Sequence, residues 1–354
     1  MARKKKQSKN RTFIYIFLSV LLVLATYGGI RGFAYYTNMY KSNISINTDK
    51  KSFLLIYEND TFDDVVKKLE ASGVVKNMES FLLAAKKMDY PNNVVQGRYE
   101  LKDGMSNKTL LRKLINGRQT PIRITFNNIR TKETLAQRLS SQLQMDSAAM
   151  ISVLNDMKIL SGYGLTPATA VSLFIPNTYE VYWDISPENL LKRMKKEFDN
   201  FWKEERLLKL NDVGLNQLEV ITLASIVEEE TRKGDEKPTV AGLYINRIHK
   251  GIALQADPTV KFAHQDFSIR RVYKKHLEID STYNTYKYAG LPPGPIRIPS
   301  IESIDAVLNY HDHNYYYMCA KDDFSGYHNF STTLQDHNRN AARYQREQNR
   351  KGIK

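Results

Sequence analysis

A run of nineteen residues, TFIYIFLSVLLVLATYGGI (12–30), constrains the fold of this 354-residue chain more than any other feature. It contains no charged residue, and at about 1.5 Å per helical residue it is long enough to cross a hydrocarbon core of about 30 Å. The eleven residues before it carry six lysines and arginines and no acid. Because basic flanks stay in the cytoplasm, we predict a cytoplasmic leader (1–11) and a single transmembrane helix (12–30) in the cytoplasmic membrane, with the remainder extracytoplasmic.

A cleaved signal peptide is the alternative to a membrane anchor. The apolar core of a signal peptide is usually shorter than this run, and no A-x-A-like cleavage site follows it. The anchor is therefore favoured. The single cysteine, Cys319, leaves no possibility of an intramolecular disulfide, so an exported fold must depend on its hydrophobic core.

The net charge of +14 would suit an anionic partner such as a nucleic acid. However, six of the positive charges lie in the leader, and the others are spread over the rest of the chain. We therefore expect no nucleic-acid binding.

After a polar stretch (40–51) that we interpret as a stalk, the pattern predicts a small α/β module over 45–126. Strands are predicted at 52–57, 97–101 and 121–126, with helices at 77–88 and 106–115. Thr61 and Asp64 form the signature of a capping box that opens one further helix. The module is similar to the LysM-like modules that hold cell-wall glycan, although small α/β modules serve many purposes.

The remaining residues, 127–354, predict a mixed domain, so that the whole chain belongs to the α+β class. Amphipathic and charged helices are expected at 131–157 and 187–208, and an apolar helix at 215–231. A tyrosine-rich stretch at 314–331 predicts a β-hairpin.

Three glutamates, Glu228, Glu229 and Glu230, end the apolar helix in the segment ASIVEEET (224–231). Glu230 lies seven residues after Leu223 and three after Val227, which places it on the apolar stripe. Glu229 falls on the polar side, where we expect it to face solvent, and Glu228 is intermediate.

A carboxyl group with apolar neighbours has a raised pKa, because its charged form is disfavoured, and can then act as a general acid near neutral pH. The alternative is that all three glutamates are solvated charges at a helix end, where the helix dipole disfavours acids only weakly. Spacing alone leaves both interpretations open.

Four blocks in a fixed order extend this pattern: ASIVEEET, VAGLYINRIHKGIALQADPTV (240–260), STYNTYKYAGLPPGPIRIPS (281–300) and YHNFSTTLQDHN (327–338). Together they closely resemble the endolytic murein transglycosylases of the YceG/MltG family. The resemblance covers roughly residues 45–345, together with the N-terminal anchor.

This resemblance implies a membrane-anchored enzyme, a lytic transglycosylase, without a cofactor. It would cleave the MurNAc–GlcNAc bond of nascent peptidoglycan strands, leave 1,6-anhydro-MurNAc ends and so limit strand elongation. Its implied partners are glycan strands and peptidoglycan synthases (penicillin-binding proteins). The family's catalytic glutamate is the second acid of a V-E-x-E-T string, which falls on Glu230, with Glu228 as the fallback. The alternative function is a non-catalytic, membrane-anchored peptidoglycan-binding protein.

The matching blocks also supply candidate substrate-binding residues, each of which could instead brace a loop or fill the core. They are Gln255, Asp257, Thr259, Tyr283, Asn284, Tyr286 and His328. Asp257 could also raise the pKa of Glu230, and Glu180 is a further carboxylate to test as its partner. The string His311-Asp312-His313 is a weak metal pattern, and we predict no metal site.

Overall fold

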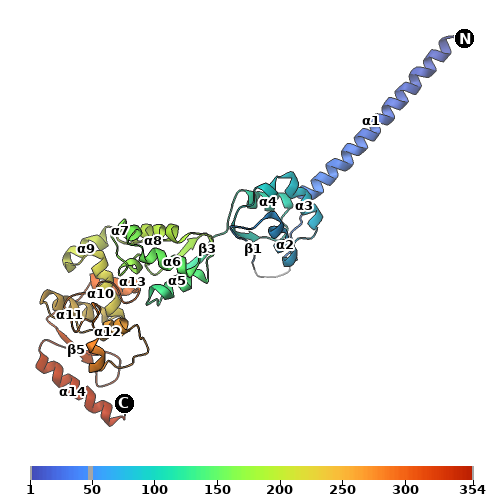
Figure 1. Cartoon of the computed structure of the whole chain (residues 1–354). Helices are drawn as coiled ribbons and strands as arrows, with labels where there is room; N and C mark the ends of the chain where they lie inside the picture. The colour runs from blue at the N-terminus through green and yellow to red at the C-terminus, as the bar shows by residue number, and fades with distance from the viewer. Residues whose placement is uncertain (1, 47–50, 353–354) are drawn as a thin grey trace. The chain divides into compact units, whose positions relative to one another are not determined.

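The computed structural model describes residues 2–46 and 51–352, which form two compact units. Unit 1 comprises the chain up to Ile122 together with 182–184, and unit 2 comprises 123–181 and the residues from Ile185 onward. Both contain helices and short strands, in agreement with the α+β prediction (Figure 1).

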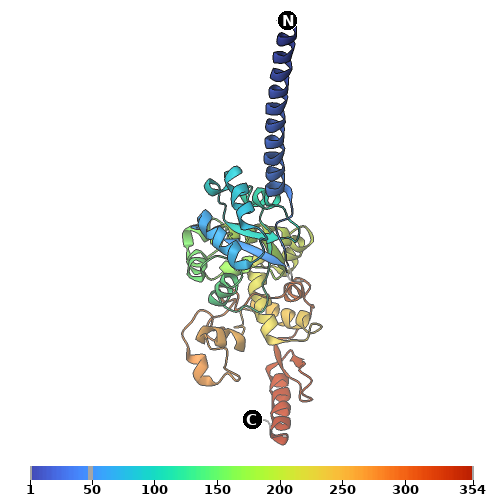
Figure 2. The same ribbon diagram turned by 90° about the vertical axis from the view of Figure 1, so that its right-hand side faces the viewer.

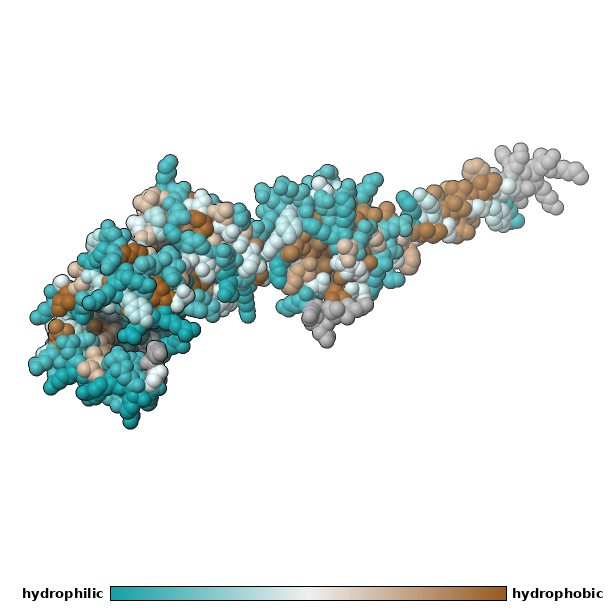
Figure 3. All heavy atoms as spheres, turned by 60° about the horizontal axis from the view of Figure 1, so that its bottom comes forward, coloured by the Kyte–Doolittle hydropathy of each residue, from teal (hydrophilic) through white to brown (hydrophobic). Residues whose placement is uncertain are grey.

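Unit 1 begins with one long helix, α1 (Ala2–Tyr40), which extends beyond the predicted span at both ends. Its stretch Arg11–Tyr40 is long and apolar enough to cross a membrane by length and composition. The side chains from Arg11 to Tyr36 are largely exposed, and their brown colour in Figure 3 contrasts with the mostly hydrophilic surface of the two units.

The rest of unit 1 is a two-stranded sheet covered by helices. Strands β1 (Ser52–Ile56) and β2 (Gly97–Leu101) pair antiparallel, with Leu54 opposite Tyr99. Around them lie α2 (Phe62–Ser72), α3 (Met78–Lys87), the short helix η1 (Tyr90–Asn92) and α4 (Asn107–Ile115). The capping box of Thr61 and Asp64 at the start of α2 is confirmed.

The predicted stalk is wrong for the residues that the structure describes, 40–46. Ile44 is fully buried in the core of unit 1, and the Asn43 side chain bonds to Asn77 and Asn107. Polar composition misled the prediction because a buried asparagine with a complete set of partners looks like a loop residue in the sequence. Residues 47–50 lie outside the described part of the chain.

The strand predicted at 121–126 forms as β3 (Ile122–Thr125) and pairs with β4 (Thr178–Val181) rather than with β1 or β2. The helical segments of unit 2 that follow β3 are α5 (Lys132–Ser140), α6 (Ser147–Asn155), α7 (Met157–Ser161) and η2 (Ala170–Leu173). The predicted helix 187–208 is divided into α8 (Pro187–Phe201) and α9 (Glu205–Val213).

Helix α10 (Gln217–Glu230) is the centre of unit 2. Asn216 and Glu219 form a capping box at its start, and every residue from Val220 to Val227 is buried. A helix that is apolar on all sides must be surrounded by protein. It packs against α11 (Lys237–His249), α12 (Asp257–His264) and α13 (Ile301–Leu308).

The C-terminal part of unit 2 contains the predicted hairpin. Strands β5 (Tyr317–Ala320) and β6 (His328–Ser331) pair antiparallel, and α14 (Leu334–Arg350) packs along both, as Figure 2 shows in red. The short helix η3 (Lys274–Glu278) belongs to the loop after α12. This arrangement brings the ends of α10 and α12 and the hairpin to one cavity.

Candidate active site

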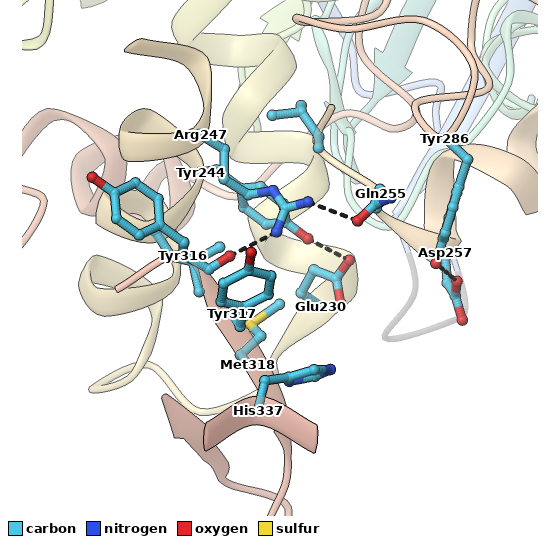
Figure 4. A pocket seen from close by; sticks show the side chains of 12 residues that line it. Glu230, Tyr244, Arg247, Gln255, Asp257, Tyr286, Tyr316, Tyr317, Met318 and His337 are labelled. Atoms are coloured by element: carbon cyan, nitrogen blue, oxygen red, sulfur yellow. Dashed lines mark hydrogen bonds between the residues drawn. The ribbon is translucent and has the colours of Figure 1, made fainter. Parts of the chain in front are cut away.

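Glu230, the last residue of α10, lies in a cavity of about 290 Å³. Figure 4 shows its carboxyl group between side chains of α11, α12 and the hairpin. The other residues that line the cavity are Leu243, Tyr244, Arg247, Leu254, Gln255, Asp257, Tyr286, Tyr316, Tyr317, Met318 and His337. Glu230, which spacing places on the apolar stripe of the helix, is thus a partly buried residue that lines a cavity.

Burial raises the pKa of Glu230 to about 7, and the negative charge of Asp257 acts in the same direction. The hydroxyl of Tyr244 opposes this shift, because it donates a hydrogen bond of 2.8 Å to Oε1 of Glu230. Within the described part of the chain, Oε2 makes no comparable bond. A proton on Oε2 would therefore be available to a ligand in the cavity.

Arg247 lies three residues after Tyr244 on α11 and forms hydrogen bonds within the same wall of the cavity. Its guanidinium is buried and donates to the carbonyl oxygens of Ala253 and Tyr316 at 2.9 and 2.6 Å. It also donates to Oε1 of Gln255 at 2.8 Å. Burial lowers the pKa of Arg247, but a guanidinium remains charged at neutral pH. Arg247 therefore joins the loop before α12 to Tyr316, the residue that precedes β5, and places a positive charge in the wall.

Asp257 and Tyr286 lie on the other side of the cavity, as Figure 4 shows. The Tyr286 hydroxyl donates to Oδ1 of Asp257 at 2.6 Å, and burial together with this bond raises the pKa of Tyr286. Asp257 itself is exposed, as is Gln255. Three of the seven predicted binding residues, Gln255, Asp257 and Tyr286, therefore meet at the cavity of Glu230.

The other four predicted binding residues do not line this cavity. Thr259 and Asn284 are fully buried and out of reach of a ligand; Asn284 holds the carbonyls of Leu277 and Ile279 at 2.9 Å. Tyr283 packs on Phe262 with ring centroids 4.7 Å apart. Burial raises its pKa to about 12.

His328 faces Glu236 rather than the cavity. Its Nδ1 lies 2.8 Å from Oε2 of the buried Glu236, which also accepts a hydrogen bond from Thr231. The contact fixes strand β6 to the segment between α10 and α11. Its position indicates a bracing role for His328.

Sequence reasoning missed the residues that the hairpin and α14 bring to the cavity, Tyr316, Tyr317, Met318 and His337. The His337 ring stacks on Tyr317, with centroids 5.6 Å apart, and burial lowers its pKa. No helical or strand period links residues so far from Glu230. Tyr244 and Arg247 could have been found from the sequence. A charged residue three positions after a tyrosine interrupts the apolar stripe of α11, which indicates that this face contacts polar groups.

Glu228 and Glu229 point into a different cavity, of about 650 Å³, which Arg130 and Arg297 also line. Arg297 lies 2.5 Å from Glu229 and 3.2 Å from Glu228, and Arg130 bonds to both oxygens of Glu229. The Glu229 side chain is 18% exposed, so the prediction that it faces solvent is wrong. Helical spacing could not reveal the two arginines, which come from distant loops.

Burial would raise the pKa of Glu228, but its hydrogen bonds with Ser300 and Ser303 and the charge of Arg297 outweigh it and lower the pKa. The backbone N–H of Ser300 donates to Oε2 of Glu228 at 2.6 Å. Glu228 is therefore held as a carboxylate. This environment does not favour its use as a proton donor.

Two further groups considered from the sequence lie elsewhere. Glu180 is an exposed residue of β4 that pairs with Arg123 at 3.0 Å and does not line the Glu230 cavity. His311 and His313 both bond to Thr239. Among the described residues, no three His, Cys, Asp or Glu side chains are grouped so that they could hold a metal ion.

A sequence model of the YceG-like family matches residues 54–343. The chain belongs to the YceG-like family. One relative is the endolytic murein transglycosylase of Bacillus subtilis (strain 168), 30% identical over 305 residues that cover 80% of this chain and 82% of the relative.

A second relative, the endolytic murein transglycosylase of Streptococcus pneumoniae serotype 2, is 28% identical over 94% of this chain. The chain spans 65% of the length of that YceG-like relative. A crystal structure of a YceG-like protein from Listeria monocytogenes is also similar, with a TM-score of 0.53 and 26% sequence identity. The matched region covers 82% of this chain and 99% of that one.

Proposed function

We propose that this protein is a lytic transglycosylase that cleaves the MurNAc–GlcNAc bond inside peptidoglycan strands. The observation that supports this most is Glu230, a carboxyl group in a cavity with a pKa raised to about 7. A carboxyl with this pKa can be protonated at neutral pH and still give up its proton. Two relatives named endolytic murein transglycosylase agree with the assignment.

In the proposed reaction Glu230 donates its proton to the glycosidic oxygen as the bond from that oxygen to C1 of MurNAc breaks. The C6 hydroxyl of the same MurNAc then forms a bond to C1 and returns its proton to the Glu230 carboxylate. The product is a 1,6-anhydro-MurNAc end, and no water is consumed. Because the attacking hydroxyl is tethered to the reacting sugar, a high effective molarity replaces a positioned water.

Neighbouring side chains have separate parts in this proposal. Tyr244 holds Oε1 of Glu230, which leaves Oε2 to carry the proton. Gln255, Asp257 and Tyr286 offer hydrogen-bonding groups to the sugar from the cavity wall. Arg247 positions Gln255 and Tyr316, the residue before β5.

We further propose that α1 anchors the protein in the cytoplasmic membrane as a single-pass helix, with its N-terminus in the cytoplasm. Its uncharged run 12–30, within a 30-residue stretch that could cross a membrane, and its basic start support this topology. Unit 2 would then act on strands outside the membrane and limit their elongation beside penicillin-binding synthases. The boundaries proposed for the LysM-like module (45–126), which would hold glycan, and for the catalytic domain (127–354) remain predictions.

The experiment is digestion of isolated glycan strands by the purified full-length protein in water enriched in ¹⁸O. Mass spectrometry should find new 1,6-anhydro ends that contain no ¹⁸O. Reducing ends labelled with ¹⁸O would instead indicate a hydrolase that uses two carboxylates, with Asp257 as the second. Binding of strands without any new ends would favour the non-catalytic peptidoglycan-binding protein.

A further inference from the structure

Side-chain contacts form a joint between the end of α1 and the rest of unit 1. The carbonyl oxygen of Asn38, in the last turn of α1, accepts hydrogen bonds from Asn107 at 2.9 Å and from Ser80 at 3.4 Å. Met39 is only 4% exposed and belongs to the core of unit 1. These contacts couple the direction of α1 to the orientation of the rest of unit 1.

Exposed aromatic and basic side chains surround this joint. Tyr36 and Tyr40 stack on each other, with ring centroids 5.6 Å apart, and are 59% and 44% exposed. Lys108 of α4 lies 2.6 Å from the Tyr40 hydroxyl and 4.2 Å from the centre of its ring. Tyrosines are enriched where a transmembrane helix leaves the hydrocarbon, and lysines there meet lipid phosphates.

An exposed leucine, Leu83, lies on the side of α3 that contacts α1. Leu83 follows Ser80, which contacts α1, by three residues, and Lys87 follows Leu83 by four, so all three share one face of the helix. Leu83 is 52% exposed and lies one turn after Ser80, whose hydroxyl bonds to α1. The only acid of α3, Glu79, lies one turn before Leu83, whereas α4 contains three cations and no acid.

The length of α1 brings this region to the lipid headgroups. The stretch that could cross a membrane, Arg11–Tyr40, has 30 residues, and its uncharged run covers 12–30. At about 1.5 Å per residue the whole stretch spans about 45 Å, which is the thickness of a bilayer including both headgroup layers. With Arg11 at the inner surface, Tyr40 therefore reaches the outer headgroup layer.

We propose that these side chains form a lipid-binding surface that seats unit 1 on the membrane crossed by α1, in contact with anionic phospholipid headgroups. This junction surface consists of Tyr36, Tyr40, Leu83, Lys87, Lys108 and Arg112. The inference rests on the proposed membrane anchor and adds that the folded module, and not only the helix, contacts lipid. Its consequence is that unit 1 stays at the membrane surface, where strands are newly made.

The test attaches a fluorophore that reports polarity to the thiol introduced by Leu83→Cys in the full chain, in a Cys319→Ser background that removes the only native thiol. Lys67→Cys on α2 is the matched control, because Lys67 has an exposed side chain (74%) and α2 has no close packing with α1. Both variants are reconstituted into vesicles of phosphatidylcholine with phosphatidylglycerol. Quenchers are carried either on the lipid or in the water.

We expect blue-shifted emission at position 83 and several-fold stronger quenching by the lipid-borne quencher than at position 67. Replacing phosphatidylglycerol with phosphatidylcholine, or adding salt, should weaken this difference, since it depends on Lys87, Lys108 and Arg112. Flotation with the vesicles, combined with water-like emission at both positions, would contradict lipid binding by the junction surface. The proposed membrane anchor would remain supported. Blue-shifted emission without lipid quenching would also contradict lipid binding by the junction surface, because another protein surface would then cover Leu83. Failure to float would overturn the anchor itself.

Discussion

Glu228 and Glu229 lie within one helical turn of Glu230, yet they line a different cavity at the end of α10, where their carboxyl groups meet different partners. In that cavity, Arg130 and Arg297 and the hydrogen bonds to Ser300 and Ser303 compensate the charges of Glu228 and Glu229. In its own cavity, Glu230 has a tyrosine hydroxyl and the further negative charge of Asp257. The groups that face adjacent glutamates thus shift their pKa values in opposite directions, lowering that of Glu228 and raising that of Glu230. We propose that the first side serves stability and the second proton transfer.

The largest effect should come from Glu230→Gln, which keeps the shape of the side chain and removes its proton. We expect formation of 1,6-anhydro ends to fall by about 10³-fold, within the range that general acid–base groups contribute. Glu229→Gln is the control, because it makes the same change one residue away. The comparison fails if the two variants lose activity equally while both remain folded.

Arg297→Met should lower the free energy of unfolding of unit 2 by about 3 kcal/mol, because it leaves two largely buried carboxylates without this partner. Urea unfolding followed through the fluorescence of Trp202, with Trp183→Phe in every protein compared, measures this change. Arg123→Met is the matched control: its pair with Glu180 is exposed, with side chains 76% and 59% accessible. Its removal should cost less than about 0.5 kcal/mol. An equal loss of unfolding free energy in the two variants would show that Arg297 does not compensate buried charge at Glu228 and Glu229.

Glu230→Gln should also stabilise the protein at pH 8, by about 2 kcal/mol. The pKa of Glu230 is raised in the folded state, so the unfolded chain loses this proton first as pH rises. Stability therefore falls between the ordinary glutamate pKa and about 7, and the glutamine variant avoids this loss. At pH 4 both proteins carry a neutral side chain and should be equally stable. A variant that is less stable than the wild type at pH 8 would contradict the uncompensated burial of Glu230.

Tyr244→Phe should have the smallest effect, an upward shift of about 0.5–1 pH unit in the alkaline limb of kcat/KM. The lost hydroxyl stabilises the ionised form of Glu230, so the pKa of Glu230 rises when it is removed. Tyr179→Phe is the control, because its hydroxyl bonds to the Ile175 carbonyl elsewhere in unit 2. A downward shift, or the same shift in both variants, would exclude Tyr244 as the group that tunes Glu230.

The sequence predicted those parts of the molecule that local patterns determine. The capping box at Thr61, the buried helix before Glu230 and the hairpin of β5 and β6 follow from spacing and composition. It failed where distant residues supply the environment: Ile44 in the core of unit 1, and Arg130 and Arg297 beside Glu229.

The candidate site divides in the same way. Position on α10 selected Glu230, and the matching blocks selected Gln255, Asp257 and Tyr286. The wall that β5 and α14 contribute depends on how the C-terminal hairpin folds back, which no local period records.

Titration of the glutamate carboxyls in the folded, full-length protein tests the account most directly. In protein labelled with ¹³C at the glutamate carboxyl carbons, the Glu230 resonance is the one that disappears in Glu230→Gln, and the Glu228 resonance is assigned in the same way. We expect Glu230 to titrate near pH 7 and Glu228 below the ordinary glutamate range. A Glu230 resonance that titrates with the exposed glutamates, near about 4.3, would contradict the proposal that this carboxyl group is kept protonated for catalysis.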